Sequence, residues 1–213
     1  MRRSYRTLSA LLAALLCAAP ALAADCAAPT AAPIPTALTA SAAQGGALHL
    51  DLSRDLAGFT PLLADYPQGA DAFYELDVPR QPIPIAGAGF GLRLTGNNHS
   101  DDLFLGACRL LEGLPPETPC VFTVTLRIAT NVDGGLVGIG GSPGSSVFFK
   151  CGITAAEPRR EVADGYYRLT LDKGNQGQDG PDMALIGNLE KDDAKAPGQY
   201  EWKTLTCRLS AAP

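Results

Sequence analysis

Histidine is scarce in this chain, with two among 213 residues, and no two cysteines stand three positions apart. Structural zinc sites need Cys and His at such short spacings, so a zinc centre is not expected. Positive charge is also scarce, with 17 Lys and Arg against 22 Asp and Glu. A net acidic chain with scattered charges is poorly suited to a phosphate backbone, so no nucleic acid partner is expected.

Long apolar segments are lacking apart from residues 8–22, and this run is too short to cross a bilayer as a stable helix. Three arginines precede it, and the small-x-small pattern Ala21-Leu22-Ala23 follows it, as in a secretory signal peptide. We therefore expect residues 1–24 to be a signal peptide and the mature protein to be secreted or periplasmic, with no transmembrane segment. Loss of the three arginines would leave 14 basic and 22 acidic residues, a net charge of −8.

The next segment, residues 25–46, is rich in Ala, Pro and Thr and ends in two glycines. That composition cannot form a packed core and predicts a flexible leader. Lipid anchoring at Cys26 is not expected, because a small residue normally precedes a lipidated cysteine and here Asp25 does. Residues 47–213 remain as one domain, which is long enough to bury a sizeable core.

Runs of helix-forming residues are absent from this domain, whereas the chain holds 23 glycines and 17 prolines. Apolar and polar residues instead alternate with period two, most clearly over residues 120–129, which indicates strands with one buried face. We expect an all-β fold, an antiparallel two-sheet sandwich of jelly-roll type. The predicted strands span residues 47–52, 72–78, 90–95, 103–111, 120–129, 147–153, 166–171 and 201–209.

Five cysteines remain once the signal peptide is removed, and an oxidising compartment would permit disulfides. Cys108 and Cys120 are equidistant from Leu114, so an antiparallel hairpin turning there would place them opposite each other. Cys151 and Cys207 are a second candidate pair, because both fall in strand-like segments. The alternative is that these four cysteines are buried free thiols that pack as small apolar residues.

Tyr200 and Trp202 share one phase of the last predicted strand, opposite to the apolar residues from Leu205 onward. Exposed aromatic rings on a sheet face can stack on sugar rings. A β-bulge would instead change the phase and return Trp202 to the core, and the bulge is the favoured interpretation.

Two polar stretches, residues 96–102 and 172–180, each begin near the end of a predicted strand. Their Asn, Gln, Asp and His side chains offer donors and acceptors for sugar hydroxyls, and their oxygens suit a hard cation such as calcium. Gly, Asn, Ser and Asp also make tight turns, so a purely structural role is the alternative. The candidate ligand-binding residues are Asn97, Asn98, His99, Asp101, Asp102, Lys173, Asn175 and Gln176.

A third stretch, residues 138–146, is rich in glycine and contains the pattern G-x-S-x-G. The nucleophile elbow that this pattern marks in hydrolases opens a helix, whereas here a predicted strand follows. A close-packed glycine turn is expected instead.

Four motifs carry a resemblance: DYPQGADAFYEL at 65–76, GNNHSDDLF at 96–104, GIGGSPGSS at 138–146 and YYRLTLDKGNQ at 166–176. Together they resemble an uncharacterised family of bacterial secreted proteins and lipoproteins, which implies export and no particular chemistry. More loosely, the Leu114–Thr118 turn before the 120–130 strand is similar to carbohydrate-binding modules and galactose-binding-like sandwiches, which often have an aromatic residue where Cys120 stands.

These observations favour a noncatalytic extracellular binding module with glycan as the leading ligand class. One alternative is an enzyme acting on an extracellular polymer through His99, Asp101 or Lys173, although the sequence leans against catalysis. Another is a structural or adhesive surface protein that calcium stabilises, and calcium is the only cofactor suggested. The oligomeric state is left open, and so is the convergence of the three stretches.

Overall fold

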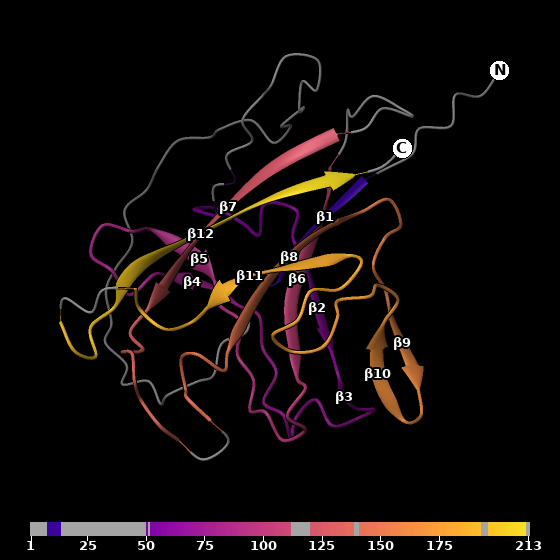
Figure 1. The fold of residues 1–213 in the computed structure, drawn as a ribbon, viewed down its shortest axis with the longest axis horizontal. Helices are drawn as coiled ribbons and strands as arrows, with labels where there is room; N and C mark the ends of the chain where they lie inside the picture. Colours follow the sequence, from indigo (N-terminus) through magenta and orange to yellow (C-terminus); the bar gives the residue numbers. More distant parts are fainter. Residues whose placement is uncertain are drawn as a thin grey trace.

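The computed structural model describes residues 8–13, 50, 52–111, 120–138, 141–192 and 196–211, and these residues form strands, turns and irregular loops without a helix. The all-β prediction is confirmed, while the jelly-roll strand order stays a prediction. Figure 1 shows the strands in chain order: β1 (Leu8–Ala13), β2 (Thr60–Ala64), β3 (Tyr66–Pro67), β4 (Arg80–Pro82), β5 (Phe90–Leu92), β6 (Phe104–Leu111), β7 (Cys120–Thr130), β8 (Phe148–Thr154), β9 (Arg160–Ala163), β10 (Tyr166–Leu169), β11 (Met183–Asn188) and β12 (Glu201–Ala211).

The largest sheet has five antiparallel strands in the order β11-β8-β1-β6-β2. Its middle strand, β1, lies within the predicted signal peptide and pairs with β6 on one side and β8 on the other. Signal-peptide removal, which stays a prediction, would leave β6 and β8 without the neighbour that they share.

A two-stranded ribbon, β7 and β12, covers one side of this sheet (Figure 1). The two strands pair without a register shift from Glu201↔Thr130 to Ala211↔Cys120. Ile128 and Leu205 of the ribbon pack with Phe149 of β8 in one buried cluster, and Phe149 is fully buried. Burial of a side chain of this size stabilises the fold by about 1.5–3 kcal/mol, which explains the strong alternation of both ribbon strands.

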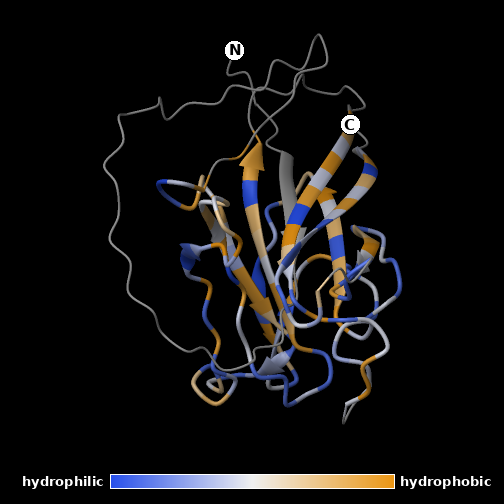
Figure 2. Cartoon of the chain, turned by 90° about the vertical axis from the view of Figure 1, so that its left-hand side faces the viewer, coloured by the Kyte–Doolittle hydropathy of each residue, from blue (hydrophilic) through white to orange (hydrophobic). Residues whose placement is uncertain are grey.

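The unbroken ribbon register means that the predicted bulge is wrong. Trp202 therefore keeps its original phase, on the face opposite buried Leu205. Its ring is partly exposed and is covered by the guanidinium of Arg127, whose Cζ lies 4.1 Å from the ring centroid. In Figure 2 the strand that ends near the C-terminus is banded by hydropathy, as expected for one packed face and one open face.

The remaining strands form two small sheets, β3-β10-β9 and β4-β5. A second buried cluster, which includes Tyr66, Tyr74 and Leu105, lies between the β3 region and the large sheet. The predicted strand over residues 72–78 is wrong, because Tyr74 N–H bonds back to the carbonyl of Ala70 in a succession of turns. Tyr74 is buried all the same, at 3 % exposed, whereas Phe73 beside it is exposed.

The cysteine prediction is partly wrong. β6 pairs with β1 and β2, whereas β7 pairs with β12, so the chain crosses between sheets and the hairpin proposed to join Cys108 to Cys120 does not form. Cys108, Cys151 and Cys207 are in no disulfide, so the expected Cys151–Cys207 bridge is not formed, and the side chain of Cys120 lies outside the described residues. The alternative, that the strand cysteines are buried thiols, is confirmed for Cys108 and Cys151.

Candidate functional site

Asp65 connects β2 to β3 in a left-handed backbone conformation, with φ of 64°. Asp tolerates this region better than most residues do, because its short polar side chain can form local hydrogen bonds. The Asp65 N–H donates to the Tyr167 carbonyl at 2.7 Å, and the Asp65 carbonyl accepts the Ser100 hydroxyl at 2.9 Å. The surrounding chain thus holds an uncommon backbone conformation in place, a feature that recurs at binding sites.

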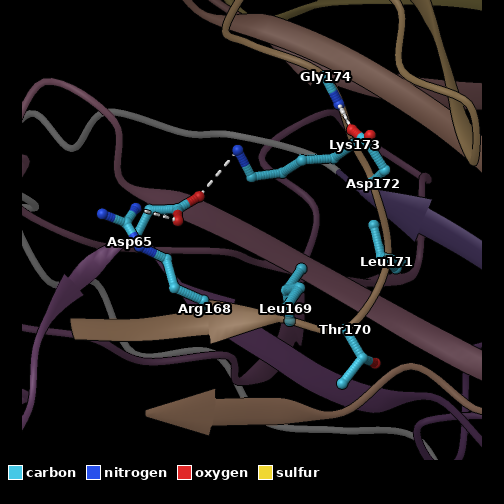
Figure 3. A pocket seen from close by; sticks show the side chains of 8 residues that line it. All are labelled: Asp65, Arg168, Leu169, Thr170, Leu171, Asp172, Lys173 and Gly174. Atoms are coloured by element: carbon cyan, nitrogen blue, oxygen red, sulfur yellow. Dashed lines mark hydrogen bonds and ion pairs between the residues drawn. The ribbon is translucent and has the colours of Figure 1, made fainter. Parts of the chain in front are cut away.

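The Asp65 carboxylate lies between two cations (Figure 3). Arg168 at the end of β10 donates an N–H to Oδ1 at 2.6 Å, and this hydrogen bond raises the pKa of Arg168. The Lys173 ammonium lies 2.8 Å from Oδ2 as an ion pair. Among the described residues this ammonium is the only partner of Oδ2, in a side chain that is only 5 % exposed.

A cavity of about 400 Å³ opens beside this carboxylate. Figure 3 shows side chains from the end of β10 and the loop that follows it, arranged around the space next to Asp65. We call this space the Asp65 cavity. Its lining consists of Asp65, Arg168, Leu169, Thr170, Leu171, Asp172, Lys173 and Gly174.

Buried Lys150 on β8 fixes the loop that forms one wall of the cavity. Its ammonium donates to the carbonyl of Lys173 at 2.6 Å and to that of Gln178 at 2.5 Å. Burial, together with the nearby charge of Lys173, lowers the pKa of Lys150. The same loop is tightly folded, because a Cβ added at Gly180 would overlap the backbone nitrogen of Gly174. The lysine anchor and the two glycines hold Lys173 close to Asp65.

Two of the three polar stretches converge at this point. The Gln176 side-chain amide donates to the Asp102 carboxylate at 3.1 Å, which joins residues 96–102 to residues 172–180. Ser100 reaches the backbone of Asp65 from the first stretch, and Lys173 reaches its carboxylate from the second. The third stretch contacts a different part of the chain: the Gly144 carbonyl accepts a hydrogen bond from Leu189 at 3.1 Å.

Two of the candidate residues take part in local turns. Asn98 accepts the N–H of Ser100 through its side chain, and the Asn175 carbonyl accepts the N–H of Gln178. Asn97 donates its backbone N–H to the Tyr74 carbonyl, 23 positions earlier, and Asp101 has a φ of 64°. All four residues are exposed, and none belongs to the lining of the Asp65 cavity.

His99 belongs to an aromatic group beside the site. Its ring stacks on Phe73 with centroids 4.1 Å apart, and it meets the Tyr74 ring edge to face with centroids 5.3 Å apart. Phe73 is 64 % exposed, whereas Tyr74 is buried. Buried Tyr66 continues the group from Tyr74 toward Arg160, which donates to the Tyr66 hydroxyl at 2.6 Å. Burial and the hydrogen bond to Asp71 raise the pKa of Tyr66.

Sequence reasoning missed Asp65 and Arg168, which are central to the site. Each is a single charged residue next to apolar strand residues, and neither stands in a polar cluster. The DYPQG and YYRLT segments that contain them were noted only as motifs. Their pairing across 103 positions arises from the β3-β10 pairing, which the sequence pattern does not indicate.

No protein family, curated protein or solved structure matches this chain. The resemblance to secreted bacterial proteins therefore stays a prediction. Across the described ranges, no helix is long and apolar enough to cross a membrane. Nor do three or more His, Cys, Asp or Glu side chains in those ranges group as a metal site requires.

Proposed function

We propose that this chain is an exported, noncatalytic binding module that holds a glycan in the Asp65 cavity through the sugar hydroxyls. The observation that carries this proposal is the Asp65 Oδ2 atom, which is buried, charged and contacted only by the Lys173 ammonium among the described residues. A carboxylate oxygen can accept more than one hydrogen bond, and a hydroxyl entering the cavity would supply a second donor. Charge-assisted hydrogen bonds of this kind are stronger than neutral ones.

The rest of the lining supports a polyhydroxylated ligand. Arg168 and Lys173 can donate to hydroxyl oxygens, and Thr170 can both donate and accept. Since Asp65 already neutralises one of the two cations, the site has little excess charge with which to select a strongly anionic group. His99 of the 96–102 stretch stacks on exposed Phe73, and this pair offers an apolar ring surface for the face of a sugar.

Binding is favoured over turnover because the groups that would act as acid or base already contact other side chains. The His99 ring is stacked on Phe73, and Lys173 is paired with Asp65. A general acid or base must reach the proton that it transfers, in a geometry set by the substrate. Asp65 and Lys173 instead fix each other, as suits a preformed binding surface.

The first experiment is a glycan array probed with the purified protein and with an Asp65→Asn variant. Asn keeps the shape of the side chain and tolerates the left-handed backbone, but it lacks the charge that makes Oδ2 a strong acceptor. Asp164→Asn is the matched control, because Asp164 is exposed and also left-handed, with φ of 52°, in the β9–β10 turn. We expect the array signal to fall for Asp65→Asn alone.

The exposed residue Gln176 provides a second variant if Asp65→Asn fails to fold. Gln176→Ala removes the link to Asp102 and should weaken the same glycan signal. An array signal that both variants leave unchanged would contradict the proposed site. A blank array for the native protein would contradict the proposed ligand class.

A further inference from the structure

The ribbon of β7 and β12 has an outer face that the Asp65 cavity does not involve. Leu205 and Ile128 point inward, so the residues of the other phase point outward along both strands. The outward positions include four threonines, two on each strand. Thr125 and Thr206 pair directly across the ribbon, and their hydroxyls are 3.5 Å apart.

Two arginines share this face with the threonines. Arg127 pairs with Thr204, and Arg208 pairs with Thr123, four residue pairs farther along the ribbon. At about 3.3 Å per residue, their backbone positions are about 13 Å apart. Over residues 121–129 and 202–210, none of the outward positions holds an Asp or Glu. The face is therefore locally positive in a chain whose net charge is −5.

Among the described residues, no acidic side chain compensates the charges of these two arginines. Arg80, Arg93, Arg159, Arg160 and Arg168 each donate to a carbonyl, amide, hydroxyl or carboxylate oxygen. For Arg127 and Arg208, in contrast, the described residues supply no hydrogen-bond acceptor and no ion-pair partner. The Trp202 ring holds the Arg127 guanidinium by a cation–π contact, which orients the group and leaves its N–H donors open to a ligand.

We propose that this outer face is a second binding surface, for a linear acidic polysaccharide. The threonine hydroxyls suit sugar hydroxyl groups, and each arginine can bind one carboxylate in a bidentate geometry. The surface is regular and extended, as a linear polymer requires. The proposal depends on the outer face of the ribbon and not on the Asp65 cavity, so either can fail without the other.

The spacing of the charges favours a polysaccharide over a nucleic acid. Each nucleotide carries one phosphate, and proteins bind such polymers with dense clusters of Lys and Arg. Here the two arginines stand about 13 Å apart along the ribbon with threonine hydroxyls between them, which matches a polymer that carries hydroxyl groups beside its carboxylates. Phosphate-rich polymers therefore serve as the competing ligand in the test.

The test measures binding of polygalacturonate oligosaccharides by calorimetry, with their methyl-esterified, uncharged form as the control ligand. We expect the acidic form to bind at low salt, the esterified form to bind much more weakly, and added salt to weaken the acidic interaction. The double variant Arg127→Gln with Arg208→Gln should lower the affinity at least about tenfold, since two charge-assisted contacts are lost. Asp65→Asn should bind polygalacturonate as the native protein does.

A second double variant, Arg127→Lys with Arg208→Lys, keeps the charge and should retain more affinity than the glutamine pair. Arg127 and Arg208 are both exposed, so circular dichroism melts should show that each double variant folds. Absence of polygalacturonate binding at low salt would overturn the proposal, and so would equal binding of the esterified form or of the glutamine variant. Tighter binding of single-stranded DNA would replace the polysaccharide by a nucleic acid.

Discussion

The Gln176 amide and the Asp102 carboxylate lie 3.1 Å apart, although 74 positions separate them in the chain. This hydrogen bond joins two polar loops that the sequence presents as separate. Ser100 of one loop and Lys173 of the other both contact Asp65, so the two loops lie together around this residue. The binding site that we propose depends on this convergence more than on any single residue.

Gln176→Ala should weaken glycan binding with little effect on stability. Gln176 and Asp102 are both exposed, and loss of an exposed hydrogen bond changes the free energy of unfolding by less than about 0.5 kcal/mol. The loop would lose its link to residues 96–102, and we expect a fall in affinity of about fivefold. Urea unfolding and a binding titration measure the two effects separately. A large fall in the urea midpoint would show that the hydrogen bond is mainly structural.

Gly180→Ala should disrupt the cavity, because its added Cβ would meet the backbone of Lys173 and Gly174. The loop must then shift, and Lys173 moves away from Asp65. Gly165→Ala is the matched control: Gly165 has φ of 78°, and a Cβ there would meet nothing within 4 Å. The control should lose about 1–2 kcal/mol from backbone strain and keep its binding. Equal loss of binding in both variants would contradict this account of the loop.

Lys191 should stabilise the segment that leads into β12. Its buried ammonium contacts Asp133 at 2.8 Å, Glu201 at 3.3 Å and the Ala196 carbonyl at 2.7 Å. Lys191→Met would remove the cation that both carboxylates contact, and we expect a clear fall in the urea midpoint at neutral pH. Adding Asp133→Asn to this variant should restore part of the loss. A single variant as stable as the native protein would show that this network contributes nothing.

Acidification should weaken this same network. The hydrogen bond from Lys191, with that from the Gly198 N–H, lowers the pKa of Asp133. A carboxyl with a lowered folded-state pKa contributes stability above its unfolded pKa of about 3.9 and loses it as the pH falls through the lower folded value. Stability measured between pH 5 and pH 2 should therefore fall less steeply for Lys191→Met than for the native protein. Parallel curves would contradict this assignment.

Cys151 should react slowly with alkylating reagents under reducing conditions. It is 1 % exposed, and burial, with the neighbouring Cys207 thiol, raises its pKa. Cys207 also has a raised pKa from burial, but it is only partly buried. Since the thiolate is the reactive form, we expect iodoacetamide at pH 8 to label Cys207 at least about tenfold faster. Mass spectrometry of the labelled peptides measures both rates, and faster labelling of Cys151 would contradict the packing described.

The long alternating segments were predictable because one face of each is buried in the sandwich. The predictions for residues 103–111, 120–129 and 201–209 agree with β6, β7 and β12 to within about two residues. The short strands β2, β3, β4 and β9 were missed, since a few residues cannot show a period. The polar loops were also predictable, whereas their convergence on Asp65 depends on pairings such as β3-β10 that join distant parts of the chain.

The most direct test of the Asp65 cavity is a titration of the ¹⁵N-labelled protein with the neutral oligosaccharide that gives the strongest array signal, followed in ¹H–¹⁵N NMR spectra. The proposed site predicts that the largest shifts fall on the amides of Asp65, Ser100, Arg168, Lys173 and Gln176, and that Asp65→Asn abolishes them. Shifts confined to other segments, or shifts that persist unchanged in Asp65→Asn, would contradict it.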